Sequence, residues 1–359
     1  MKNICYMISI LVLGALLVMV CLLKSCQSQK GGDGTAAIEV ASGTNGDYIK
    51  WVDFNITYEA LNTAYDLDVA SYDSPVHLNW IELLAYAGAK SGGSFEKGSV
   101  SRIEKLASEL SSGETTMEEL TKDMDYYEYY YEAYEAVLGG MVGEYEIEQE
   151  DGKGGKSWKK VYGLKAFSPI AKGFEYSDYD DFGSSRSYGY KRQHLGHDMM
   201  GQIGTPIIAI ESGYVEALGW NQYGGWRIGI RSFDGKRYYY YAHLRQNFPY
   251  ALDLKEGSVV TAGDVIGYMG HTGYSTRENT NNIETVHLHW GLQLIFDESQ
   301  KEGNNEIWID CYALTRFLYK NRSLTEKNVE TKEWFRSFQM KDPAAEAYKK
   351  SPACTENEQ

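Results

Sequence analysis

Histidine is scarce in this chain, and most of it falls in three short segments. Five of the seven histidines lie in the stretches QHLGHD, YYYYAHL and VHLHW, which begin at positions 193, 238 and 286. Aromatic and β-branched residues around them are typical of strands or strand ends. Since residues i and i+2 of a strand face the same side, His287 and His289 point into one space. This pattern favours a β domain built around a polar site.

The segment from 161 to 320 predicts that β domain. Short strand patterns recur there, and the run 226–233 followed by Asp234-Gly235 and 236–241 predicts a hairpin with a type I′ turn. A helix is expected only at 310–319. The domain should therefore be an antiparallel β structure. We interpret residues 321–359 as a polar, partly extended C-terminal tail.

The segment 51–148 predicts a helical domain with unknown partners. Apolar residues recur there at helical spacing, Thr115 and Glu118 suggest a capping box, and Gly139-Gly140 should end the last helix. Residues 149–160 are polar and glycine-rich, which indicates a linker. The stretch 83–93 resembles lysozyme-like transglycosylases, but Lys90 occupies the place of their catalytic glutamate.

An uncharged apolar run covers residues 5–23, long enough to span a bilayer as a helix. We interpret 1–25 as a signal anchor with its N-terminus inside, followed by a flexible linker at 26–50. A cleaved signal peptide and a lipoprotein signal ending at Cys26 are the alternatives. The predicted fold class is therefore α+β and multidomain: a transmembrane helix, a helical domain and a β-rich domain.

The net charge and the cysteine content argue against two classes of function, nucleic-acid binding and metal binding by thiolates. The net charge of −15 argues against nucleic-acid binding, which requires basic patches. The five cysteines include no CxxC pair, so a thiolate metal site is not expected. Imidazole and carboxylate groups do suit zinc, and a catalytic zinc keeps three protein ligands and one water. His194, Asp198 and one or two of the other histidines can supply those ligands, and such a site could also hold iron.

The motifs and their order resemble the lysostaphin/LytM-type zinc endopeptidases of bacterial cell walls. His-x-x-x-Asp is followed by Tyr-Ala-His-Leu and then by His-x-His. The glycine pattern between 163 and 297 is also similar, including Gly204-Thr205-Pro206 and Gly270-His271-Thr272-Gly273. The resemblance implies the duplicated hybrid motif fold and cleavage of peptidoglycan peptides by attack of a zinc-bound water.

The resemblance also implies a role for each site residue. His194, Asp198 and His289 would be the zinc ligands. His243 and His287 would be the catalytic pair, with one of them, assigned here to His287, as general base and the other stabilising the oxyanion. The remaining histidines, His197, His271 and His77, are expected outside the site.

One segment departs from the family pattern. Residues 277–285 are inserted just before the His-x-His strand, and loops beside an active site commonly shape the substrate groove. The sequence thus predicts a membrane-anchored, extracytoplasmic zinc endopeptidase facing the cell wall. The alternative is a non-catalytic scaffold or activator in a cell-envelope or sporulation complex, and a muramidase in 51–148 is a third hypothesis.

Overall fold

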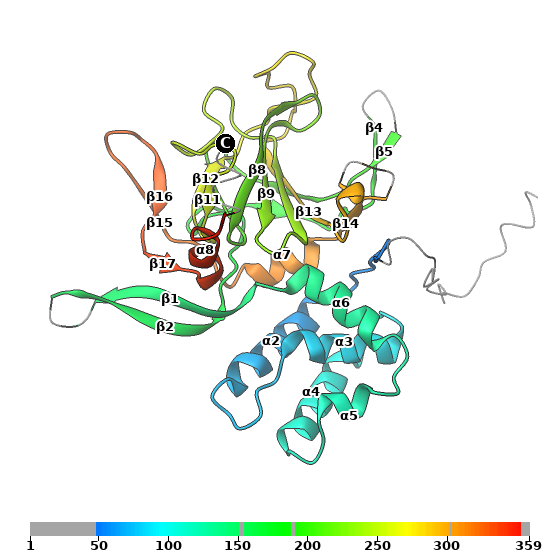
Figure 1. Cartoon of the computed structure of the whole chain (residues 1–359). Coiled ribbons are helices and arrows are strands. Elements are labelled where there is room, and N and C mark those ends of the chain that lie inside the picture. Colours follow the sequence, from blue (N-terminus) through cyan, green and yellow to red (C-terminus); the bar gives the residue numbers. More distant parts are fainter. Residues whose placement is uncertain are drawn as a thin grey trace, which may run out of the picture. The chain divides into compact units, whose positions relative to one another are not determined.

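The computed structural model describes residues 48–352 except 151, 153, 188–190, 302 and 304. The predicted signal anchor and all but the end of the predicted N-terminal linker lie outside the described residues. Within the described part of the chain, no helix is both long enough and apolar enough to cross a membrane. A helical region is followed by a β-rich domain (Figure 1).

The helical region agrees with the predicted apolar periodicity. Leu83, Leu84 and Ala87 are fully buried on one helix, whose start is capped by the Asn79 side chain accepting N–H bonds from the next turn. The capping box is formed by Thr116 and Glu119, one residue later than predicted. The helices are α2 (Tyr58–Ser71), α3 (Trp80–Ser91), α4 (Ser99–Ser111), α5 (Met117–Thr121) and α6 (Tyr127–Leu138).

The helical prediction for 139–148 and the linker prediction for 149–160 do not match the structure. β1 (Val142–Glu150) and β2 (Lys156–Leu164) pair along their whole length as a long antiparallel hairpin (Figure 1). In β1 the run VGEYEIE alternates acidic residues with Tyr145 and Ile147, a period of two that fits a strand. Gly152, Gly154 and Gly155, which suggested a linker, lie between these two strands.

The predicted antiparallel β domain is confirmed. Its main sheet has the order β11-β8-β9-β10-β13-β6-β3, with β14 also paired to β13. The strands are β3 (Ser177–Asp178), β6 (His197–Met200), β8 (Gly213–Asn221), β9 (Gly225–Ser232), β10 (Arg237–Ala242), β11 (Val259–Val260), β13 (His287–Leu294) and β14 (Ile307–Ile309). Smaller pairs are β4 (Ser185–Ser187) with β5 (Lys191–Gln193) and β7 (Pro206–Ile208) with β12 (Val265–Tyr268).

The hairpin between β9 and β10 is where the sequence placed it, but its turn is of another type. A type I′ turn needs positive φ at both central residues. Among the described residues Gly235 has a φ of +75°, whereas Asp234 is not in that region. The Asp234 carboxylate instead accepts bonds from the Ser232 hydroxyl at 2.6 Å and the Lys236 amide at 3.1 Å.

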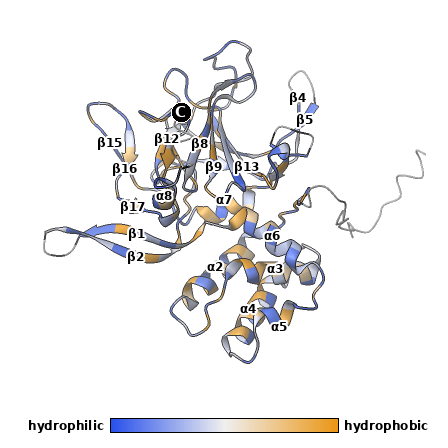
Figure 2. Ribbon diagram, viewed as in Figure 1, coloured by the Kyte–Doolittle hydropathy of each residue, from blue (hydrophilic) through white to orange (hydrophobic). Residues whose placement is uncertain are grey.

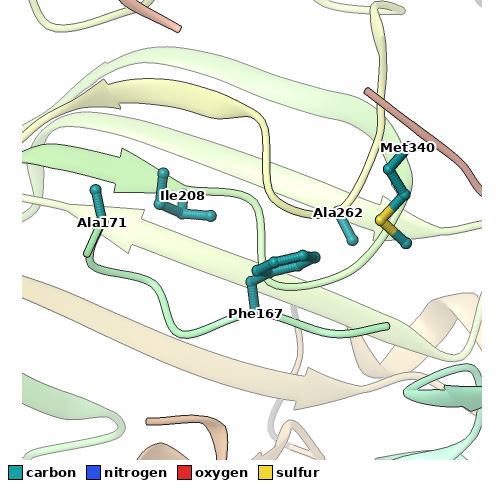
Figure 3. Close-up of a cluster of buried hydrophobic side chains, with 5 residues drawn as sticks. All are labelled: Phe167, Ala171, Ile208, Ala262 and Met340. Carbon is teal, nitrogen blue, oxygen red and sulfur yellow. The ribbon is translucent and has the colours of Figure 1, made fainter. Parts of the chain in front are cut away.

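The described part of the predicted polar tail, residues 321–352, is folded onto the β domain. It forms β15 (Thr325–Lys327), β16 (Trp334–Arg336), β17 (Met340–Lys341) and α8 (Pro343–Tyr348), and β17 pairs with β1. Met340 lies in a buried apolar cluster with Phe167, Ala171, Ile208 and Ala262 (Figure 3). The tail anchors itself through a few apolar residues spread among charged ones, which is why average polarity gave the wrong prediction.

Helix α7 (Tyr312–Leu318), predicted at 310–319, is mostly apolar (Figure 2). The Phe317 ring packs against Tyr65 and Trp80 of the helical region, with centroid distances of 5.5 and 5.7 Å. On its other side Thr315 accepts a 3.1 Å bond from the indole of Trp290 in β13. The helical region and the strand that carries His287 and His289 thus share α7.

A buried charge network forms a second junction between these regions. Arg237, at the start of β10, is 2% exposed and contacts the Glu211 carboxylate at 2.8 Å. It also donates to the carbonyl of Ala136 at 3.0 Å. That carbonyl belongs to the last turn of α6, where backbone oxygens lack helical partners. Arg237 therefore donates hydrogen bonds both to a buried carboxylate and to a carbonyl at the end of a helix.

We predict that Arg237→Ala destabilises the chain by about 3–5 kcal/mol, because it leaves Glu211 buried without its cation. The matched control is Lys236→Ala, which removes a partly exposed pair with Glu135 and should cost less than about 1 kcal/mol. Urea unfolding followed by tryptophan fluorescence measures both. Equal losses in the two variants would contradict the role assigned to Arg237.

Candidate metal and catalytic centre

Two adjacent strands and the loop before one of them position the three predicted ligands. Asp198 lies on β6 and His289 on β13, and the register of these strands places the two residues directly opposite each other. His194 lies in the turn before β6, where its amide bonds to the carbonyl of Ser184 at 3.0 Å. Residues opposite each other in an antiparallel pair face the same side of the sheet. The backbone pairing therefore brings the side chains together.

The three side chains present their ligand atoms to one point. His194 Nε2 lies 3.0 Å from Asp198 Oδ1 and 3.0 Å from His289 Nδ1, and these last two atoms are 2.9 Å apart. Zinc bonds of about 2.0–2.2 Å in tetrahedral geometry place neighbouring ligand atoms at about this spacing. Within the described part of the chain this is the one group of histidine, cysteine and acid side chains that converges so closely. The donor set fits zinc.

The surroundings of His194 favour a ring in which Nε2, the nitrogen that faces Asp198 and His289, carries no hydrogen. Its Nδ1 lies 3.3 Å from the carbonyl oxygen of Asp181 and 3.1 Å from that residue's carboxylate. Both are acceptors, so Nδ1 carries the hydrogen and Nε2 offers its lone pair. Arg186 contacts the Asp181 carboxylate and approaches Asp198 Oδ2 at 3.3 Å. Arg186 and Asp181 thus orient two of the three ligands.

The protonation states also suit a cation. Burial raises the pKa of Asp198, but the neighbouring His194 and His289 rings outweigh burial and hold that pKa well below its ordinary value. Burial lowers the pKa of His289, partly offset by Asp198, and so favours the neutral ring. A carboxylate beside neutral imidazoles is the form that binds a metal ion.

The predicted catalytic pair lies next to this group. The rings of His243 and His287 are 4.7 Å apart between centroids, and His287 Nε2 is 3.7 Å from Asp198 Oδ1. Each ring bonds through Nδ1 to a backbone carbonyl, His243 to Thr272 at 3.0 Å and His287 to Thr285 at 2.8 Å. A carbonyl can only accept, so both rings in their neutral form have an unprotonated Nε2 that can take a proton.

His243 owes its position to an unusual backbone. It follows β10 with a φ of +61°, a left-handed conformation that is uncommon outside glycine. Burial lowers its pKa well below the ordinary value, and neighbouring His287 adds to this effect. In β10 the alternate residues Tyr238, Tyr240 and Ala242 line the site. If the strand continued regularly, the side chain of the next residue, His243, would point to the opposite face of the sheet. The left-handed backbone conformation directs this side chain toward the site.

The other histidines lie outside the group, as the sequence predicted. His197 is 2% exposed and bonds to Asp178 at 2.9 Å. His271 bonds to the carbonyl of Ile283 at 2.7 Å, and His77 bonds to Asp68 in the helical region at 2.9 Å. Each has a structural partner. Their exclusion supports the ligand assignment, which itself stays a prediction.

The centre opens into a cleft with a volume of about 1270 Å³. Its floor includes the cleft-facing residues of β8, β9, β10 and β13. The predicted insertion at 277–285 supplies Asn282, Ile283, Glu284 and Thr285 to its lining. Sequence reasoning missed the polar residues Asn221, Arg227 and Tyr240 of this cleft. Their position could be derived only from the strand register.

The part of the chain that carries this centre is similar to known proteins. Residues 192–302 match the model of peptidase family M23. L-Ala--D-Glu endopeptidase of Bacillus subtilis (strain 168) is 33% identical over 154 residues, which are 43% of this chain and 45% of that protein. Lysostaphin of Staphylococcus simulans is 43% identical over 84 residues, 23% of this chain and 16% of lysostaphin. The matches thus span less than half the length of these relatives.

A structural relative has a broader overlap. The structure of a LytM-type protein from Ruminococcus gnavus is 25% identical, covers 75% of this chain and 89% of that chain, and superposes with a TM-score of 0.47. The residues that match the model of peptidase family M23 lie in the β-rich domain, and a helical region precedes this domain. The resemblance to LytM and lysostaphin proposed from the sequence is confirmed.

We predict one zinc ion per chain, lost in His194→Ala and in His289→Ala because two protein ligands bind zinc far more weakly than three. Elemental analysis after dialysis against a zinc-buffered solution measures the content. His271→Ala is the control and should retain the metal. Full zinc occupancy in His289→Ala would contradict the ligand assignment.

Proposed function

We propose that the chain is a zinc endopeptidase that hydrolyses peptide bonds of bacterial peptidoglycan. The observation that carries this proposal is the convergence of His194, Asp198 and His289 on one point of an open cleft, beside two histidines with free Nε2 atoms. Two similar proteins are named as endopeptidases, L-Ala--D-Glu endopeptidase and glycyl-glycine endopeptidase ALE-1, and these names support the reaction class. Their cell-wall context, implied by the family resemblance, supports the substrate.

In this proposal His194 Nε2, Asp198 Oδ1 and His289 Nδ1 hold the metal. Zinc bound there would act as a Lewis acid and lower the pKa of a water molecule toward neutrality. Asp198 also balances the charge, and Arg186 holds its second oxygen. No serine or cysteine nucleophile is needed, since water attacks the peptide carbonyl directly.

His243 and His287 carry the proton chemistry. Their Nδ1–H groups donate to backbone carbonyls, and these bonds fix the orientation of each ring and of its Nε2. His287 is nearer to the ligands, at 3.7 Å from Asp198, and we assign it the role of general base. Burial favours the neutral form of His243, so His243 would first have to gain a proton during the reaction; it could then stabilise the oxyanion or donate to the leaving amine.

We further propose that the protein is anchored in the cell membrane by its first 25 residues, with the peptidase domain outside. The uncharged run from 5 to 23 supports an anchor. The substrate supports the orientation, because peptidoglycan lies outside the membrane. The complete ligand set favours an enzyme over a non-catalytic scaffold.

We predict that His243→Ala and His287→Ala each reduce turnover by about 10²–10⁴-fold, the usual contribution of general acid–base catalysis, while zinc stays bound. The zinc-loaded full-length protein is incubated with defined muropeptides, and fragments are identified by mass spectrometry. Chelation should abolish cleavage and added zinc should restore it.

The His289→Ala protein is the negative control. Cleavage by that variant, or cleavage that survives chelation, would overturn the zinc mechanism. Zinc-loaded wild-type protein that cleaves no muropeptide would favour the scaffold hypothesis.

A further inference from the structure

The cleft contains more positive charge than its own acids neutralise. Four cationic side chains line it: Arg186, Arg192, Arg227 and Lys301. Arg186 is paired with Asp181 and Asp198, and Lys301 with Glu216. Neither of the two remaining arginines forms an ion pair with any residue that the structure describes. The chain has 50 acidic residues against 35 basic ones, so two arginines without an ion pair in this cleft call for an explanation.

Arg227 lies on the floor of the cleft, level with the candidate metal centre. β10 pairs Ala242 with His289 of β13 and Tyr241 with Ile228 of β9. This register places Arg227, the neighbour of Ile228, in line with Ala242 and His289 and on the same face. Two strand spacings, about 10 Å, separate the backbones of β9 and β13. That span is within reach of a substrate side chain one to three residues from the scissile bond.

Arg192 approaches the same region from β5. Its guanidinium carbon lies 5.6 Å from the ring centroid of Tyr223 and 5.0 Å from that of Tyr274. Contacts with two aromatic rings hold the planar group in place. Its Nε is buried and has no hydrogen-bond acceptor among the described residues.

Tyr240 links the two arginines to the reaction centre. Its ring centroid lies 6.0 Å from that of His289, and its hydroxyl accepts a 3.1 Å bond from Asn221. Burial raises the pKa of Tyr240, while Asn221 and the charges of Arg227 and Arg192 oppose that rise. Tyr240, Arg227 and Arg192 all line the same cleft as His289.

Three acids line the cleft, Asp198, Glu284 and Glu306, and none of them is paired with Arg192 or Arg227 among the described residues. Glu284 and Glu306 are exposed, and Glu306 accepts a 2.8 Å bond from the indole of Trp308. Arginine presents donors in a planar fork that matches a carboxylate. We propose that Arg227 and Arg192 form a subsite that binds a carboxylate of the peptide substrate, so that the enzyme selects acidic peptides. This inference rests on the proposed endopeptidase function.

The carboxylate can come from an acidic side chain or from a peptide C-terminus, and three stem peptides separate these sources. One has both carboxylates free, one carries a carboxamide on the acidic side chain, and one carries a C-terminal amide. The zinc-loaded full-length protein is assayed for kcat/KM on each. We expect about a 10–100-fold preference for the free acid over the amide that removes the recognised group, typical of hydrogen bonds to a charge.

The variants test whether the arginines cause this preference. Arg227→Gln and Arg192→Gln should each bring the acid-to-amide ratio toward one, and Arg227→Lys should keep part of it because the charge remains. Lys191→Gln is the matched control: it removes an exposed charge from β5 outside the cleft lining, and the ratio should stay at the wild-type value. Arginine variants that lower kcat/KM equally for all peptides would show a structural role and overturn the subsite.

A binding experiment separates failure of the subsite from failure of the proposed function. Calorimetry with the His289→Ala protein compares the affinities of the acid and amide peptides without turnover. Preference for the acid, with no cleavage by the wild-type enzyme, would sustain the subsite and reject the endopeptidase. Equal cleavage and equal binding of all peptides would reject the subsite and sustain the endopeptidase.

Discussion

The pairing of β6 with β13 is the constraint on which the centre depends. It sets Asp198 opposite His289, and a shift of one residue would turn one of the two to the other face of the sheet. The neighbouring pairing of β13 with β10 then fixes Ala242 beside His289, which places His243 one residue further on. Contacts on the side of β13 that faces away from the cleft help to maintain this register. The buried Trp290 bonds to Thr315 of α7, so the strand is held from its rear face.

The sequence predicted the part of the site that depends on local periodicity. His-x-His on a strand gave two side chains on one face, and the order of motifs gave the family. His243 could not be placed by periodicity, because its position depends on a left-handed residue. Arg227 and Tyr240 come from strands whose alignment is set by tertiary pairing. Only the register shows that they share a face with His289.

The errors in the fold prediction have a common physical origin. β1 and the C-terminal segment both carry many charged residues, and their average composition suggested helix, linker or tail. These segments are structured through tertiary contacts, since β17 pairs with β1 and Met340 packs in a cluster with Phe167. Segments that contact each other across nearly 200 positions give no local signal. By contrast α3, with its Asn79 cap and apolar face, is specified within its own turns.

The position of Arg237 has a consequence for how this architecture can vary. Arg237 begins the strand that ends just before His243, and it is also the residue that binds the last carbonyls of α6. The helical region is therefore not an independent attachment that could be exchanged freely for another module. A replacement would have to offer the same helix end to Arg237, or leave Glu211 to be neutralised in some other way. This places the fusion boundary for chimeric proteins before α2, not between α6 and the sheet.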